Sequence, residues 1–240
     1  MQLLRNVFQV GGSLNGVTVC GDYNEGGNFF DGNSYAINTP EGILLFDCGN
    51  GDTLDQIFAN LRYWSLDPEK IVACFITHPH WDHAGACHKL KRLGVKLYAH
   101  VNTAHAIAAG DRRCCGFLYH KKFIPTEVDF PLQEGDTVQF GALLITAHHF
   151  PGHTQGCTAF CFDWEGKSVV VSGDIIGTLM VGYFGWSGSI DFDRKVYLES
   201  LKRFSEYTPD VMLPGHGLIY LGNPQSRIET ALNQALIQWR

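Results

Sequence analysis

The chain has 240 residues, 45% of them hydrophobic, and its formal net charge at pH 7 is −6. This length is ordinary for one α/β domain with a full hydrophobic core, and we predict a single domain over residues 1–240. The negative charge argues against a nucleic-acid-binding surface, which usually carries a basic excess. The apolar stretches are of strand length, so the sequence predicts no membrane-spanning helix.

The N-terminal residues and the cysteines bear on where the protein works. Residues 1–10 show no long apolar core of a signal peptide and lead into a strand-like segment. Of the eight cysteines, Cys48, Cys74 and Cys161 lie in apolar patterns, where a free thiol behaves as a small hydrophobe. We therefore expect reduced thiols and a cytoplasmic location. Cys114 and Cys115 follow two arginines, which can activate a thiol, but a redox role is the less favoured interpretation.

The first half of the chain alternates predicted strands with predicted helices. Short apolar, β-branched runs predict the strands, and longer segments with apolar residues on one face predict the helices. The predicted strands are 34–37, 43–47, 71–77 and 96–99, and the predicted helices are 53–63, 84–93 and 103–109.

The second half is richer in strands and ends in a helix. The predicted elements are strands 137–140, 142–147, 158–163, 167–171 and 211–213, and a helix over 194–206. Asn223 can cap the final helix and Pro224 suits its first turn. The apolar face predicted for that helix consists of Ile228, Ala231, Leu232, Ala235, Leu236 and Trp239. The repeated strand-then-helix order fits two sheets packed together with helices outside.

A dense cluster of metal-capable side chains follows the apolar run 71–76. Residues 78–83 read His-Pro-His-Trp-Asp-His. An apolar run that ends in such a cluster places it at the tip of a buried strand, where α/β folds put their ligand sites. Imidazoles this close repel one another when protonated, so a cation is the natural way to hold them neutral and ordered. The alternative, a His-rich polar turn, is disfavoured by three histidines and an aspartate at this spacing.

Three further donors each follow an apolar stretch and lie beside a glycine. They are His153 in Pro-Gly-His-Thr, Asp174 in Ser-Gly-Asp, and His216 in Pro-Gly-His-Gly. Each is predicted at another strand tip that leads into a tight loop. With the cluster they make seven donors, which are too many for one zinc ion and suit two.

These residues resemble the ligand set of the metallo-β-lactamase-fold hydrolases, and among them the glyoxalase II-like branch. The similarity runs from about residue 33 to residue 216. It implies an α/β fold of the αββα sandwich type, with two mixed sheets and helices on the outer faces. It also implies two metal positions: His78, His80 and His153 at the first, Asp82, His83 and His216 at the second, and Asp174 bridging both.

The resemblance implies a binuclear hydrolase that cleaves an ester, thioester or lactone bond with a metal-bridging hydroxide. The expected cofactors are two divalent ions, zinc first, with iron or manganese as alternatives. Asp82 is the predicted catalytic residue, which orients the hydroxide and passes its proton to the leaving group. Zinc β-lactamases of this fold lack the bridging carboxylate, so Asp174 disfavours β-lactam hydrolysis.

Three other classes of protein remain open. One is a mononuclear iron enzyme similar to persulfide dioxygenases, against which the complete second ligand set argues. Another is a phosphodiesterase of the same fold. A non-catalytic binding subunit ranks last, because such members typically lose ligands and none is missing here.

Two segments, 110–123 and 175–190, are predicted to form walls of the site around a small-molecule substrate. Large apolar faces beside a metal can line a pocket, although loop packing or a homodimer contact would explain them equally well. The candidate substrate-binding residues are Tyr183, Phe184, Trp186 and His120. One of the neighbours His148 and His149 is a candidate for a hydrogen bond to a metal ligand. No nucleic-acid or membrane partner is predicted.

Overall fold

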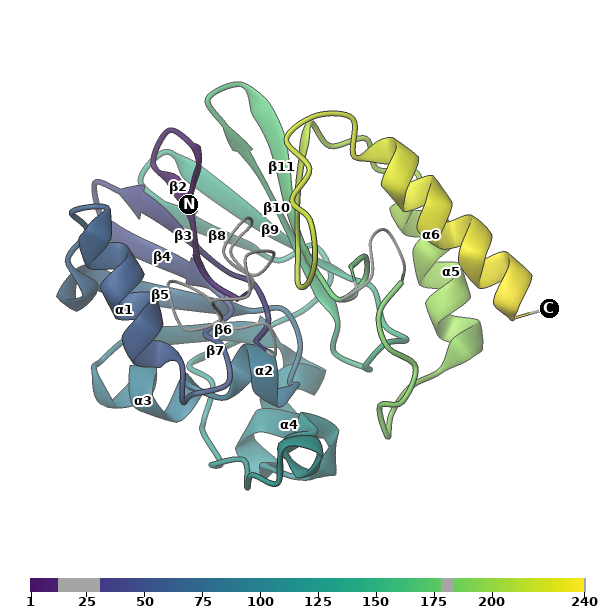
Figure 1. Cartoon of the computed structure of the whole chain (residues 1–240), viewed down its shortest axis with the longest axis horizontal. Helices are drawn as coiled ribbons and strands as arrows, with labels where there is room; N and C mark the ends of the chain where they lie inside the picture. The colour runs from purple at the N-terminus through teal and green to yellow at the C-terminus, as the bar shows by residue number, and fades with distance from the viewer. Residues whose placement is uncertain (13–30, 178–183, 240) are drawn as a thin grey trace, which may run out of the picture.

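The structure is a computed structural model that describes residues 1–12, 31–177 and 184–239 (Figure 1). Its strands form two sheets, which confirms the predicted αββα arrangement. The first sheet has the order β1-β2-β3-β4-β5-β6-β7. Its strands are β1 (Gln2–Leu4), β2 (Val7–Gly11), β3 (Ser34–Thr39), β4 (Gly42–Phe46), β5 (Ile71–Ile76), β6 (Lys96–His100) and β7 (Phe130–Leu132).

The second sheet has the order β12-β11-β10-β9-β8. Its strands are β8 (Thr137–Phe140), β9 (Leu143–His149), β10 (Thr158–Trp164), β11 (Lys167–Gly173) and β12 (Val211–Pro214). Both sheets are mixed: β4 to β7 pair in parallel and β1 to β4 antiparallel, while β11 and β12 form the parallel pair of the second sheet.

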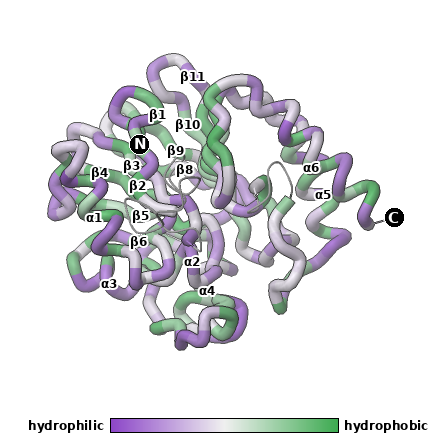
Figure 2. Tube along the Cα trace, viewed as in Figure 1, coloured by the Kyte–Doolittle hydropathy of each residue, from purple (hydrophilic) through white to green (hydrophobic). Residues whose placement is uncertain are grey.

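Helices cover the outer faces of both sheets (Figure 1). The helices are α1 (Leu54–Tyr63), α2 (Trp81–Ala84), α3 (Cys87–Arg92), α4 (Val101–Ala109), α5 (Arg194–Phe204) and α6 (Gln225–Gln238), and the 3-10 turns are η1 (Pro68–Lys70), η2 (Arg112–Cys114) and η3 (Gly116–Tyr119). Figure 2 shows hydrophobic segments along the strands between these layers. In the described part of the chain, no helix combines the length and apolar character that crossing a membrane requires.

The alternation of side chains along the strands builds three apolar layers. In β4, Leu44 and Phe46 point between the sheets, whereas Leu45 points outward to α1 and α3. The layer between the sheets contains packed aromatic rings: Phe75 of β5 stacks on Phe46 at 5.2 Å and makes an edge contact with Phe160 of β10 at 5.3 Å. Both faces of the central strands are therefore buried, which holds the strand ends in fixed positions.

The sequence-based assignments differ from the structure at five places. The helix predicted at 84–93 is two short helices, because the chain at Gly85 lies against the backbone of Asn50, where a Cβ atom would come within 2.5 Å. The short strands β1 and β7 were not predicted. Asn223 does not cap α6 through its side chain; it adopts a left-handed conformation with φ of 50°, and Pro224 occupies the cap position. Leu236 is 40% exposed and does not belong to the buried face of α6.

Candidate metal centre

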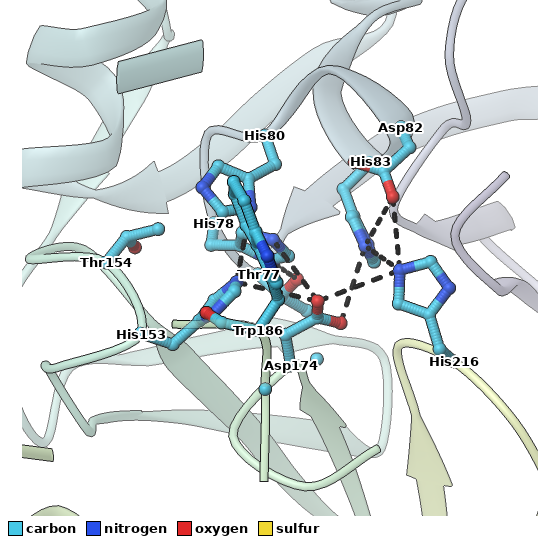
Figure 3. Close-up of polar contacts among 12 residues, drawn as sticks. Thr77, His78, His80, Asp82, His83, His153, Thr154, Asp174, Trp186 and His216 are labelled. Atoms are coloured by element: carbon cyan, nitrogen blue, oxygen red, sulfur yellow. Dashed lines mark hydrogen bonds and ion pairs between the residues drawn. The ribbon is translucent and has the colours of Figure 1, made fainter. Parts of the chain in front are cut away.

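The predicted metal ligands converge at one end of the two sheets, from four separate strand ends (Figure 3). His78 and His80 follow β5, and the short helix α2 carries Asp82 and His83. The three downstream ligands come from the second sheet: His153 lies between β9 and β10, Asp174 directly follows β11, and His216 follows β12. The site therefore lies at the junction of the sheets, and each sheet supplies part of it.

The first group of donors contains three histidines. Ligand atoms of His78, His80 and His153 all lie within 4.8 Å of one another. Nδ1 of His80 is 3.2 Å from Nε2 of His153. One carboxylate oxygen of Asp174, Oδ2, lies 3.9 Å from His78 Nε2 and 3.5 Å from His153 Nε2. These atoms surround a space that one small cation fits.

The second group lies on the other side of Asp174. Nε2 of His83 and Nε2 of His216 are 3.2 Å apart. Oδ2 of Asp82 is 3.1 Å from His216 Nε2 and 3.6 Å from His83 Nε2. Asp174 reaches this group as well, with Oδ1 at 3.4 Å from His83 and Oδ2 at 3.6 Å from His216. Asp174 thus contacts both groups, as a bridging ligand must.

Hydrogen bonds fix the tautomers of two of these histidines. His83 Nδ1 lies 2.8 Å from a carboxylate oxygen of Asp47, and His153 Nδ1 lies 2.7 Å from the backbone carbonyl of Trp186. Both partners can only accept, so both Nδ1 atoms carry the hydrogen. The Nε2 lone pairs of His83 and His153 therefore point into the site.

His78 and His80 are fixed through hydroxyl groups. Thr77 Oγ1 donates to Asp47, so it accepts from His78 Nδ1 at 3.0 Å. Ser189 Oγ donates to Asp191 at 2.6 Å and so accepts from His80 Nε2 at 3.2 Å. The remaining nitrogens, Nε2 of His78 and Nδ1 of His80, present lone pairs to the site. Such partners are the usual way in which proteins orient metal-binding histidines.

Buried donor atoms without hydrogen bonds support metal coordination. Among the described residues, His78 Nε2 and Asp174 Oδ1 are buried side-chain atoms that have no hydrogen-bond partner. Leaving such a group unsatisfied costs about 1–3 kcal/mol, which a coordinated cation would offset. The lone pairs of His80 Nδ1 and His153 Nε2, which face one another at 3.2 Å, also call for a positive charge between them. Imidazole and carboxylate donors suit zinc, iron or manganese.

The pKa shifts of the histidines in the site also favour metal binding. Burial and neighbouring imidazoles lower the pKa of both His78 and His80 well below the ordinary value, so they are in the neutral form that binds metals. Burial also lowers the pKa of His83, but the carboxylates of Asp82, Asp174 and Asp47 raise it to about 10. The carboxylates around the second group therefore attract a positive charge strongly.

The predicted substrate-binding residues have different places in the structure. The side chain of Trp186 is 44% exposed and its ring lies 6.3 Å from that of His80, so it stands at the edge of the site. Phe184 is instead buried among α5 and α6, with its ring 4.4 Å from Trp239. His120 is exposed at the end of η3. Tyr183 lies outside the described residues.

The structure also bears on His149 and on the paired cysteines of residues 114 and 115. His149 bonds no ligand of the site; its Nε2 lies 2.9 Å from the carbonyl of Gln155 and its ring stacks on His100 at 3.8 Å. The arginines beside Cys114 and Cys115 do not activate these thiols, because burial raises the pKa of each to about 12. Both cysteines are buried, so neither resembles a reactive thiol.

Several residues that orient the ligands were not predicted. Asp47, Thr77, Ser189 and Asp191 hold the histidines but belong to no metal-binding motif. Only Asp47 had a signal in the sequence, because a carboxylate ends the apolar run 43–46 in the same way that the ligands end theirs. Thr77 directly precedes His78, whereas Ser189 and Asp191 come from a segment whose approach to the site depends on the tertiary fold.

The fold and this arrangement of donors define a metal-binding hydrolase of the αββα sandwich type. The chain belongs to the metallo-beta-lactamase superfamily, whose family model matches residues 27–216. A solved structure of similar fold is the class B3 di-zinc metallo-beta-lactamase LRA-12 from an Alaskan soil metagenome, with a TM-score of 0.71, 23% identity and 86% of each chain covered.

Several curated relatives carry the names of thioesterases, and two of them show the extent of the similarity. The chain is 26% identical to the atrochrysone carboxyl ACP thioesterase of Emericella nidulans over 80% of its own length and 53% of the relative's. It is also 26% identical to the acyl-coenzyme A thioesterase MBLAC2 of Homo sapiens, over 58% of its own length and 54% of the relative's. The chain thus spans about half the length of each of these proteins.

Proposed function

We propose that this protein hydrolyses acyl thioesters, using two divalent metal ions held by the seven predicted ligands. The observation that carries the proposal is the complete donor set with Asp174 in contact with both groups. The names of the two thioesterase relatives favour a thioester over an oxygen ester or a lactone. Membership of the glyoxalase II-like branch stays a prediction.

The roles of the residues follow from their positions. Bound divalent ions would supply Lewis acidity and bring the pKa of a water molecule close to neutrality. The five histidines and Asp174 hold the two positions at a fixed separation. Asp82 contacts the second group through Oδ2 and is itself buried, with His83 and His216 holding its pKa low against the effect of burial. It is therefore a carboxylate that can take a proton from water and pass it to a leaving thiolate.

A serine-hydrolase mechanism at this site is disfavoured by the hydrogen bonds of Ser189. In a catalytic triad the histidine accepts the serine proton and is oriented by the acid. Here Ser189 Oγ donates directly to Asp191, and the free nitrogen of His80 faces the other metal ligands. His80 is therefore not the acceptor of the serine proton, as a triad requires, and Ser189 orients His80 instead of attacking a substrate.

A panel of substrates tests the proposal. Purified protein of known metal content would be assayed with acyl-coenzyme A thioesters, oxygen esters, lactones, a phosphodiester and a chromogenic cephalosporin. We expect thioesters to be turned over fastest, with kcat in the common range of about 1–10³ s⁻¹, and the cephalosporin slowest. The Asp174→Ala variant should be inactive on all of them. Faster turnover of the phosphodiester, or no thioester turnover by fully loaded protein, would overturn the proposal.

A further inference from the structure

His216 differs from the other four histidines of the metal centre in how its ring is held. Each of those four donates from its second ring nitrogen to a hydroxyl, a carboxylate or a carbonyl, which is the usual arrangement. Among the described residues, no hydrogen-bond partner reaches Nδ1 of His216. Its side chain is also 12% exposed, whereas that of His83 is fully buried. The place of the His216 ring therefore depends on the backbone that carries it.

That backbone is the turn that follows β12, and Asn33, directly before β3, holds it on both sides of His216. The side-chain amide of Asn33 donates to the carbonyl of Pro214 at 3.1 Å and to that of Gly217 at 3.3 Å. Its backbone N–H donates to the carbonyl of Gly215 at 2.6 Å. One residue of the first sheet thus bonds the two positions before His216 and the position after it.

The orientation of the Asn33 amide is fixed by its partners. Both side-chain partners in the turn are carbonyl oxygens, which only accept, so the NH₂ group faces the turn. Oδ1 accepts from Nε2 of Gln9 in β2 at 3.0 Å. Asn33 is 1% exposed, so solvent cannot replace these bonds. The amide is therefore a fixed link between β2 and the turn that carries His216.

The preceding residue, Gly32, links the same segment to the other two ligands of the second group. The backbone N–H of Gly32 donates to the carbonyl of Asp82 at 3.0 Å. Gly32 also lies against the ring of His83, where an added Cβ atom would be 2.4 Å from Cε1. The two residues before β3 thus contact Asp82, His83 and the turn of His216, which come from separate parts of the chain.

We infer that Asn33 is a positioning residue for the second metal position, which places His216 by holding its turn on both sides. An imidazole without a partner at Nδ1 can rotate about its side-chain bonds, so a firmly held backbone is what limits its range. Loss of the amide removes the bond to Gly217 and one of the bonds to Pro214. The turn could then carry His216 away from Asp82 and His83. The inference concerns metal binding and does not rest on the proposed function.

The variant Asn33→Ala tests this inference. Metal-free protein would be titrated with Co²⁺, and the visible absorption would report the filling of each position. Loss of a group that orients a ligand typically weakens metal affinity about 10–100-fold. We expect a loss of that size for the second ion and the parent affinity for the first, whose histidines keep their partners. Asn33→Asp, which has the same size but no NH₂ group, should show the same selective loss and replaces the Ala variant if that one does not fold.

The matched control is Tyr35→Phe in β3. Tyr35 is also 1% exposed, and its hydroxyl donates to the same carbonyl of Pro214 at 2.6 Å. This bond lies only on the N-terminal side of His216, and the Asn33 bonds remain in the variant. We therefore expect Tyr35→Phe to lower the midpoint of urea unfolding and to bind both ions with the parent affinity.

The outcomes separate the inference from a general loss of stability and from the proposed function. Parent affinity for the second ion in the Asn33 variants, equal weakening of both ions, or the same selective weakening in Tyr35→Phe would overturn the positioning role. If the Asn33 variants weaken the second ion selectively and the parent protein cleaves no thioester, the positioning role stands and the proposed function fails.

Discussion

Asp47 ties the second group of ligands to the first sheet. Its carboxylate accepts from the backbone N–H and the hydroxyl of Thr77 and from Nδ1 of His83. It is 1% exposed, so solvent cannot replace these bonds. A residue that binds no metal thus fixes the tautomers of two histidines, His83 directly and His78 through Thr77.

We predict that Asp47→Ala weakens metal binding by about 10–100-fold, because His83 and His78 lose the group that orients them. Leaving buried donors unpaired should also lower the free energy of unfolding by about 1–3 kcal/mol for each. Metal titration and urea unfolding measure the two effects. Asp163→Ala, at an exposed position of β10, is the control and should change neither. Full metal affinity in Asp47→Ala would contradict this role.

Trp186 offers an apolar face at the edge of the site while its backbone carbonyl orients His153. The change Trp186→Ala keeps that carbonyl, so metal content should stay the same. We predict that kcat/KM falls by about 1–3 kcal/mol for substrates with bulky acyl groups and much less for small ones. An equal loss for every acyl size, or a loss of metal, would show that Trp186 is structural.

The convergence of the seven candidate ligands could be predicted from the sequence, whereas the residues around them could not. The ligands cluster at strand ends beside glycines, and that local pattern is visible in the chain. Ser189 and Asp191 reach the site from a segment distant in the sequence, and nothing in their neighbours marks them. Phe184 shows the opposite error: an aromatic residue near Asp174 in sequence packs into the α5–α6 core, because proximity along the chain does not set the direction of a side chain.

At the scale of elements, the loop between β9 and β10 places His153 by packing against α5. Gly152 has a φ of 135°, and a Cβ atom there would collide with the backbone of Tyr197 in α5. The backbone N–H of Asp193, the cap of α5, donates to the carbonyl of Gly152 at 2.9 Å. A glycine at this position therefore brings α5 close to the ligand loop.

A strained backbone conformation alone costs about 1–3 kcal/mol, and we predict that Gly152→Ala lowers the free energy of unfolding by more than that. We also predict that it reduces metal affinity at the first position. Gly94→Ala is the matched control: Gly94 has a φ of 85°, but no atom lies within 4 Å of the place that an added methyl group would take. Urea unfolding and metal titration of both variants separate backbone strain from collision with α5. If the two variants behave alike, the close approach to α5 is unimportant.

The regular elements were mostly predictable, and the exceptions have physical causes. The strands β5 and β9 to β11 are apolar runs with clear ends, so their positions followed from the sequence. The helix at 84–93 was assigned as one element because its apolar residues have a helical period; only contact of Gly85 with Asn50 interrupts it. β7 has three residues, one of which is Pro131, and is too short for an alternating pattern to show in the sequence.

At the scale of the whole molecule, the metal centre joins two sheets that are also linked without it. The hydroxyl of Tyr35 in β3 donates to the carbonyl of Pro214 at 2.6 Å, and the side-chain amide of Asn33 donates to the same carbonyl at 3.1 Å. The backbone N–H of Thr158 in β10 donates to the carbonyl of Thr77 at 2.9 Å. These bonds hold the strand ends in register, so the ligands are in place before a metal binds.

The metal content of the parent protein and of Asp174→Ala tests the central claim most directly. Elemental analysis and metal titration should give two divalent ions per chain for the parent. Because Asp174 contacts both groups of ligands, its loss should weaken both ions, by about 10-fold or more. Two results would contradict a binuclear centre bridged by Asp174. One is a single iron ion per chain whose affinity does not change in His216→Ala, and the other is an Asp174→Ala variant that keeps two tightly bound ions.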